Sequence, residues 1–108
     1  MRDEQAVAAE IAAKGLDAPH VAPEDVDREI AAEDYHVFPG SCLTVCALTL
    51  RNGFIVTGES ACASPANYNQ ELGLRIARAN AREKIWPLLG FRLRDQLVTH
   101  CTAGGRNE

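Results

Sequence analysis

The 108-residue sequence has no run of about 18 consecutive apolar residues, the length that a membrane-spanning helix requires. Its first fifteen residues are charged and alanine-rich, without the apolar centre of a secretory signal peptide. Both absences lead us to expect a cytoplasmic protein that binds no membrane. A chain of this length encloses one modest hydrophobic core, so residues 1–108 are expected to form a single domain.

Four cysteines are present, but they do not form the pair of CxxC motifs that a zinc ribbon requires. A reducing cytoplasm also disfavours structural disulfides. We interpret Cys42, Cys46, Cys62 and Cys101 as buried thiols, the first three of which fall in strand-like segments. A nucleophilic Cys62 needs a neighbouring base, and the sequence fixes no histidine beside it. We therefore expect no metal and no cofactor.

Paired carboxylates, a catalytic triad and a glycine-rich phosphate loop are also missing, so we expect a protein without catalytic residues, not an enzyme. The formal net charge of −4 is unevenly divided. Residues 1–34 hold ten acidic and three basic residues, whereas residues 66–98 hold six basic and three acidic ones. A net acidic protein is poorly suited to duplex nucleic acid, which requires many neutralised phosphates. The basic segment remains compatible with one small anion.

The acidic segment 1–34 predicts two short helices. Apolar residues recur at helical spacing over residues 3–14, and Gly15 is placed to end that helix. Pro23 suits the first turn of a second helix, which we expect to run to about Ala32. The stretch 35–40 then reads as a linker that closes with a Pro-Gly turn.

The clearest local pattern is a β-hairpin over residues 41–62, where two strand-like runs flank an Asn-Gly turn. A two-residue turn pairs Arg51 with Phe54, whereas a three-residue turn with a left-handed Gly53 pairs Leu50 with Phe54. We favour the second register, because it gathers apolar and cysteine side chains on one face. The other face is also rather apolar, so we expect something to cover part of it.

Residues 64–99 predict a helical segment that begins near Ser64 or Asn67, both suitable N-cap residues. Two apolar stripes lie almost opposite one another, one ending at Trp86 and one at Ile85. The helix is therefore expected to be covered on two sides. A domain this small has few elements for that purpose, so we expect a homo-oligomer.

Pro87 is expected to break or kink this helix. The segment after Pro87 reads as a final helix or an irregular arm, and residues 100–108 read as a flexible tail. The bulky apolar side chains of the arm are expected to turn inward: Leu88, Phe91, Leu93 and Leu97. The predicted fold is α+β, with a β-hairpin, or small antiparallel sheet, packed on a long C-terminal helix and two short N-terminal helices.

The junction between the hairpin and the long helix is the main candidate site. A helix N-terminus presents free N–H groups and the positive end of the helix dipole, which favour an anion. Arginines at spacings of three and four form a ridge along the same helix. The candidate ligand-binding residues are Glu59, Ser60, Ser64, Asn67, Arg75, Arg78 and Arg82. Helix capping alone also accounts for these residue types, so a structural role stays open beside the functional one.

Residues 44–93 resemble a family of short phage proteins typified by gene forty-nine of a podophage and gene sixty-six of a Shigella phage. The following motifs carry the resemblance: Thr44–Cys46, Asn52–Phe54, Gly58–Cys62, Ser64, Pro65, Asn67, Tyr68, Ala77–Ala81 and Lys84–Gly90. Each motif is weak alone, but the combination is specific and spans nearly half the chain. The family has no assigned mechanism, so the resemblance implies a phage origin, and with it the host cell cytoplasm, without implying an activity.

The expected function is that of a non-catalytic phage accessory protein that acts by stoichiometric binding, in counter-defence or host takeover. In one form it sequesters a small anionic or nucleotide ligand at the helix end and the arginine ridge. In the alternative form it inhibits a host protein, which it binds through the acidic N-terminal surface.

Overall fold

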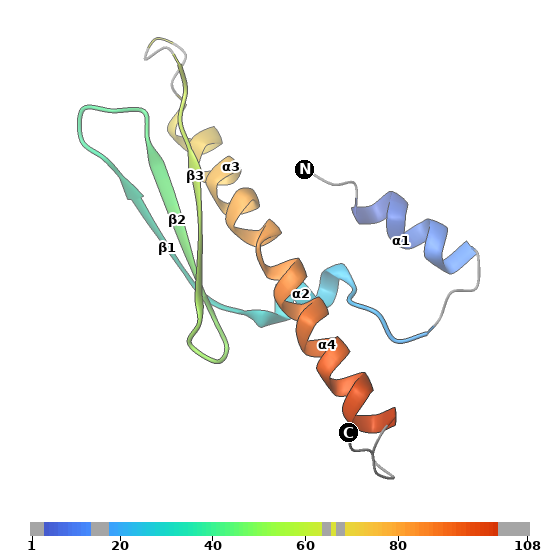
Figure 1. The fold of residues 1–108 in the computed structure, drawn as a ribbon. Helices are drawn as coiled ribbons and strands as arrows, with labels where there is room; N and C mark the ends of the chain where they lie inside the picture. The colour runs from blue at the N-terminus through green and yellow to red at the C-terminus, as the bar shows by residue number, and fades with distance from the viewer. Residues whose placement is uncertain (1–3, 14–17, 64–65, 67–68, 102–108) are drawn as a thin grey trace.

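The computed structural model describes residues 4–13, 18–63, 66 and 69–101 (Figure 1). The elements in chain order are α1 (Glu4–Ala13), α2 (Pro23–Glu29), β1 (Ile30–Val37), β2 (Thr44–Leu50), β3 (Ile55–Ser60), α3 (Gln70–Glu83) and α4 (Ile85–Cys101). An antiparallel sheet of order β1-β2-β3 lies against α3, which confirms the α+β fold. None of the helices in the described part of the chain could cross a membrane.

The β2–β3 hairpin adopts the three-residue turn that the sequence favours. Leu48 pairs with Val56, and the backbone N–H of Leu50 donates to the carbonyl of Phe54 at 2.7 Å. Gly53 has a φ of +92°, a conformation that glycine adopts without steric cost. This register places Leu48, Leu50 and Val56 together in the buried core, as predicted.

The strand β1 was not predicted from the sequence. The expected helix to Ala32 is wrong, because α2 ends at Glu29 and Ile30–Val37 pairs antiparallel with β2. The expected linker over residues 35–40 is also partly wrong, because residues 35–37 belong to β1. The run Ala-Ala-Glu-Asp favours a helix and lacks period-two alternation, so the local pattern hides a strand that pairing with β2 stabilises. The hairpin thus becomes a three-stranded sheet.

The sheet and α3 meet through a contact between backbones. A Cβ atom added to Gly58 of β3 would lie 2.8 Å from the Cα of Ala81, and closer still to the nitrogen of Ala81 and the carbonyl oxygen of Ala77. Only glycine on the strand and alanine on the helix permit this approach. The buried core around the contact is made of Val26, Cys46, Leu48, Leu50, Val56, Ala77, Ala81, Ile85 and Leu89.

The long helical segment is divided in two, and it begins later than expected. Asn69 is the N-cap of α3, and its side chain accepts a hydrogen bond from the N–H of Leu72 at 2.9 Å. The expected starts, Ser64 and Asn67, lie outside the described residues. Pro87 marks the predicted break, since α3 ends at Glu83 and Pro87 falls in the first turn of α4. There its missing N–H removes no helical hydrogen bond.

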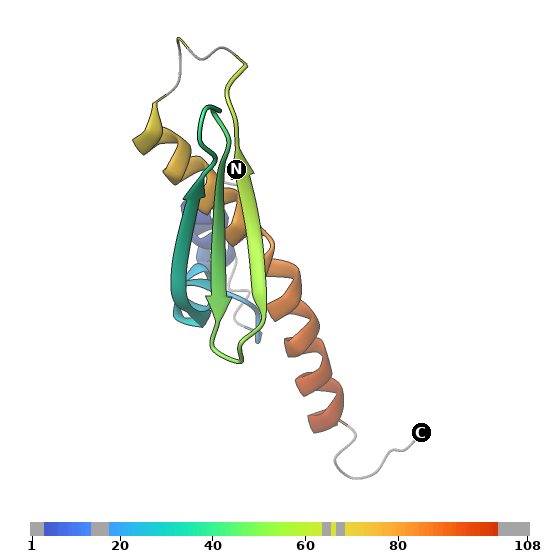
Figure 2. The same ribbon diagram turned by 90° about the vertical axis from the view of Figure 1, so that its left-hand side faces the viewer.

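Within the single chain, the second apolar stripe of the helical segment is only partly covered. Only the stripe with Ala77, Ala81 and Ile85 faces the sheet, while Leu72 and Ile76 are exposed. Leu88 and Phe91 are exposed too, because α4 runs past the end of the sheet, where no strand covers it (Figures 1 and 2). The predicted inward arm is therefore wrong for these two residues. Leu93 and Leu97 are half-buried.

The second face of the sheet is open. The cross-strand register places Ala32, Val45, Ala47 and Ile55 on it, among others. Figure 2 looks onto the sheet with α3 behind it, and no described helix or strand lies in front. The expected cover for this face is not supplied by the described part of the chain.

We predict that Gly58→Ala lowers the free energy of unfolding by about 1–3 kcal/mol, because the new methyl group forces β3 and α3 apart. Gly90→Ala on α4 is the matched control, since a Cβ there meets nothing within 4 Å and alanine favours the helix. Urea unfolding followed by circular dichroism measures both variants. Equal stability of the two variants would contradict the close contact at Gly58.

Candidate functional site

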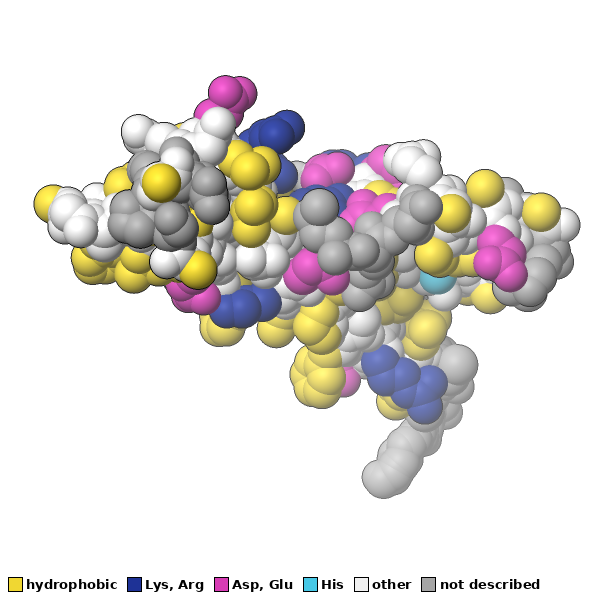
Figure 3. Space-filling model, turned by 90° about the horizontal axis from the view of Figure 1, so that it is seen from above, with side chains coloured by type: hydrophobic (Ala, Val, Ile, Leu, Met, Phe, Trp, Pro, Cys, Tyr) yellow, Lys and Arg dark blue, Asp and Glu magenta, His cyan; other side chains and the backbone are white. Residues whose placement is uncertain are grey.

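The acidic opening third of the chain folds onto the basic helices. Ion pairs join Glu33 of β1 to Arg78 at 2.9 Å, Asp27 of α2 to Arg82 at 2.9 Å, and Glu29 to Arg92 at 3.1 Å. Glu4 of α1 also pairs with Arg82 and accepts a hydrogen bond from the indole Nε1 of Trp86. The uneven charge of the sequence is therefore largely matched within the molecule. Figure 3 shows basic, acidic and hydrophobic side chains interspersed on the face that it presents.

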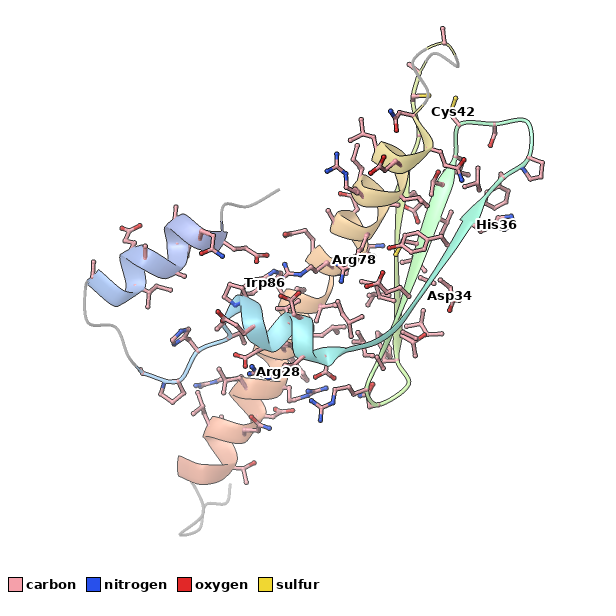
Figure 4. The ribbon with its side chains drawn as sticks, turned by 180° about the vertical axis from the view of Figure 1, so that it is seen from behind. Arg28, Asp34, His36, Cys42, Arg78 and Trp86 are labelled. Carbon is pink, nitrogen blue, oxygen red and sulfur yellow. The ribbon has the colours of Figure 1, made fainter. Side chains whose placement is uncertain are left out.

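This pairing engages two of the three arginines on the expected ridge. The side chain of Arg82 is only 14% exposed between its two carboxylates, and Arg78 is tied to β1 (Figure 4). Arg75 is exposed and makes no ion pair within the described residues. It is the arginine of the ridge that stays available for a ligand.

The other expected site residues lie at the end of β3. Ser60 lies beside the first turn of α3, where a hollow of about 90 Å³ is lined by residues that include Ser60, Asn69 and Gly73. Glu59 pairs in register with Val45, so it belongs to the open face of the sheet. Ser64 and Asn67 lie outside the described residues.

A larger, charged pocket lies where α2, the β2–β3 turn and α4 meet. Its volume is about 300 Å³. The residues that line it are His20, Val21, Asp25, Arg28, Glu29, Arg51, Leu89, Arg92, Leu93 and Gln96. We call it the Arg51 pocket. The sequence did not indicate it, because its residues come from three distant segments.

Glu29 lines the Arg51 pocket and fixes the position of Arg92 there. It is buried, and its two carboxylate oxygens accept from the two terminal nitrogens of Arg92, each at 3.1 Å. The hydrogen bonds from Arg92, with further attraction to Arg92 and Arg51, hold the pKa of Glu29 below its usual value. The backbone N–H of Arg51 donates to the carbonyl of Glu29 at 3.0 Å, which fixes the turn beside the carboxylate.

The remaining cations of the pocket differ in their partners. Arg28 pairs with Asp25 one turn earlier in α2 (Figure 4). Arg51 is exposed, and within the described residues its guanidinium makes no ion pair or hydrogen bond. The pocket therefore contains three guanidinium groups and two carboxylates, and it leaves Arg51 able to bind an added anion.

The prediction of buried thiols is confirmed for Cys46, whereas Cys42 and Cys62 are only half-buried. Cys46 is buried, and this burial raises the pKa of its thiol. A hydrogen bond between Cys42 and Cys62 raises the pKa of the Cys42 thiol. Raised pKa values favour the thiol over the nucleophilic thiolate. Across the described ranges, no three His, Cys, Asp or Glu side chains are grouped so as to hold a metal ion.

The protein is a small α+β protein. Its three-stranded antiparallel sheet is covered by a helix on one face, and a charged pocket lies at one end of the sheet. The chain belongs to the phage protein (N4 Gp49/phage Sf6 gene 66) family, whose model matches residues 21–97. The match runs from the segment before α2 into α4, so it includes the whole sheet and the Arg51 pocket except His20. No curated protein and no solved structure matches the chain.

We predict that Glu29→Gln lowers the free energy of unfolding by about 1–3 kcal/mol at pH 7, because it weakens the charged hydrogen bonds to Arg92. The pKa of Glu29 is lower in the folded chain than the unfolded value of about 4.3. Its stabilising effect is therefore present above that pH and lost as the pH falls through the folded pKa.

Chemical unfolding between pH 7 and pH 2 measures this difference. The difference in the free energy of unfolding between wild type and Glu29→Gln should become smaller as the pH is lowered. Glu59→Gln, a change at an exposed carboxylate on β3, is the control and should leave a smaller difference at pH 7. A difference in unfolding free energy that stays constant from pH 7 to pH 2 would contradict a stabilising role for the ionised carboxylate of Glu29.

Proposed function

We propose that this phage protein is a non-catalytic accessory factor that sequesters a small anionic or nucleotide ligand by stoichiometric binding, in counter-defence or host takeover. The observation that carries the proposal is the Arg51 pocket, where guanidinium groups from three separate elements line one cavity of about 300 Å³. That volume is at the lower end of the range for small-molecule sites. Arginine is well suited to bind phosphate, because its planar fork of donors matches two phosphate oxygens.

The pocket offers a ligand both charge and apolar contact. Arg92 is held in place by buried Glu29, so little side-chain freedom is lost when a ligand binds it. Arg51 supplies the charge that is not matched by a carboxylate. Val21, Leu89 and Leu93 provide an apolar wall for the uncharged part of the ligand. A compound with one phosphate group and a flat or apolar portion suits this arrangement.

The junction of β3 and α3 is a second location for the same function. Thr44 is fully buried there, and within the described residues its hydroxyl has no hydrogen-bond partner. A Cβ on Gly73 would lie 3.3 Å from that hydroxyl oxygen, so the group lies beside the first turn of α3. Ser60 and Asn69 line the hollow at this end, and Arg75 follows in the second turn of α3.

Inhibition of a host protein through the acidic N-terminal surface is the alternative proposal. Glu4, Asp27, Glu29 and Glu33 are already paired with arginines, which reduces the charge that this surface presents to a basic partner. Exposed Glu24 and Asp34 remain for such a contact. Ligand sequestration is therefore the function that the geometry supports better.

Thermal shift of the purified protein tests the proposal against inorganic phosphate and mono-, di- and cyclic nucleotides. We predict a concentration-dependent rise in melting temperature with at least one of these compounds, since a ligand that binds only the folded state stabilises it. Arg51→Gln should abolish most of the shift. Arg75→Gln is the matched control, because Arg75 is also an exposed arginine but belongs to α3.

Each outcome of this experiment separates the proposals. Loss of the shift in Arg75→Gln, with Arg51→Gln unaffected, would move the site to the junction of β3 and α3. The absence of a shift with every compound would contradict sequestration of a small anion. Charge reversal at Glu24 and Asp34, followed by pull-down of host proteins, would then test the alternative.

A further inference from the structure

Large apolar side chains surround a hollow where α4 passes the β2–β3 turn. Phe91 of α4 is 71% exposed and Phe54 of the turn is 55% exposed, with Leu88 at the edge. They line a cavity of about 260 Å³ together with Leu50, which is nearly fully buried. We call this the Phe91 surface. Single exposed apolar residues are common, but two aromatic side chains around one hollow are typical of an interaction site.

The exposed side of α4 has the spacing of a helix that pairs with another helix. Leu88, Phe91, Asp95 and Val98 follow one another at intervals of three, four and three residues, the spacing of positions a and d in a coiled-coil seam. All four are exposed. A different side of the helix packs on the core through Ile85 and Leu89. The helix thus presents a second side with exposed Leu88 and Phe91 that does not face the core.

The shape of the chain also differs from that of a compact monomer. Its radius of gyration is 17.9 Å, whereas a compact chain of this length has a value of about 13 Å. Its accessible surface is 7288 Å², against about 5,900 Å² for a monomer of this mass. Figures 1 and 2 show α4 extending beyond the sheet.

We propose that the Phe91 surface binds a second copy of this chain, with the two α4 helices antiparallel about a twofold axis. A twofold interface uses the same surface on both partners, so it must contain both a projection and a hollow. Phe91 supplies the projection, and the cavity beside Phe54 and Leu50 supplies the hollow.

The charges around the surface favour a second copy over a different protein. Asp95 and Arg94 are adjacent on α4, and both are exposed. When residue 91 of one helix faces residue 95 of the other, Asp95 lies one turn from Arg94 of the second copy. Each Asp95 is then close enough to Arg94 of the other copy to pair with it, so the surface carries part of its own complementary charge.

Sedimentation equilibrium over a range of protein concentrations tests this interface. The wild type should reach twice the 11.7 kDa mass of the chain. Phe91→Asp and Phe54→Asp should each weaken dimerisation by at least about 30-fold, as expected for central interface residues. Ile55→Asp is the matched control, because Ile55 is next to Phe54 and also 55% exposed but lies on the open sheet face. It should leave the dimer unchanged.

Exchanging the charges of residues 94 and 95 tests the interface a second time, without changing an apolar side chain. Asp95→Arg and Arg94→Asp should each weaken the dimer, and the double variant should restore part of the loss. A wild type that stays monomeric, or a dimer lost only in Ile55→Asp, would overturn the proposal. Circular dichroism of each variant confirms its fold, and a folded Phe91→Asp variant that dimerises like wild type would also overturn it.

Discussion

The close approach of β3 to α3 at Gly58 is the constraint on which the rest of the structure depends. Because the strand backbone meets the helix backbone at Ala77 and Ala81, the sheet lies directly on the helix without a layer of large side chains between them. Larger side chains, such as Leu48 and Ile85, fill the space around the contact. The direction of α3 is thereby set by the sheet, and α4 continues past the end of the strands.

Ion pairs fix the N-terminal elements in place, in addition to the close contact at Gly58, Ala77 and Ala81. Glu29, Glu33 and Asp27 lie close together in sequence in α2 and β1, and each is joined to an arginine of α3 or α4. Exposed ion pairs contribute little stability individually, but the Glu29 carboxylate is buried and receives two hydrogen bonds. These pairs fix the N-terminal elements against the helices. The Glu29–Arg92 pair, which joins α2 to α4, also lines the Arg51 pocket.

Much of this fold could be predicted from local sequence patterns, whereas the pocket could not. The Asn-Gly turn located the hairpin, the gathering of apolar and cysteine side chains on one face selected its register, and Pro87 marked the helix break. The strand β1 was missed, since its stability comes from pairing with β2 and its own residues favour a helix. The Arg51 pocket joins Arg28, Arg51 and Arg92, whose proximity follows from the tertiary fold. The sequence contained one signal for the ion pairs: acidic residues are concentrated in residues 1–34 and basic residues in residues 66–98.

The central claim is that the chain binds a small anion at the Arg51 pocket. NMR titration of isotope-labelled protein with the nucleotide that stabilises it most would test this residue by residue. The account predicts that the largest shift changes fall on the guanidinium and amide signals of Arg51 and Arg92 and on the amide of Glu29. Changes confined to Arg75 and its neighbours, or none anywhere, would contradict it.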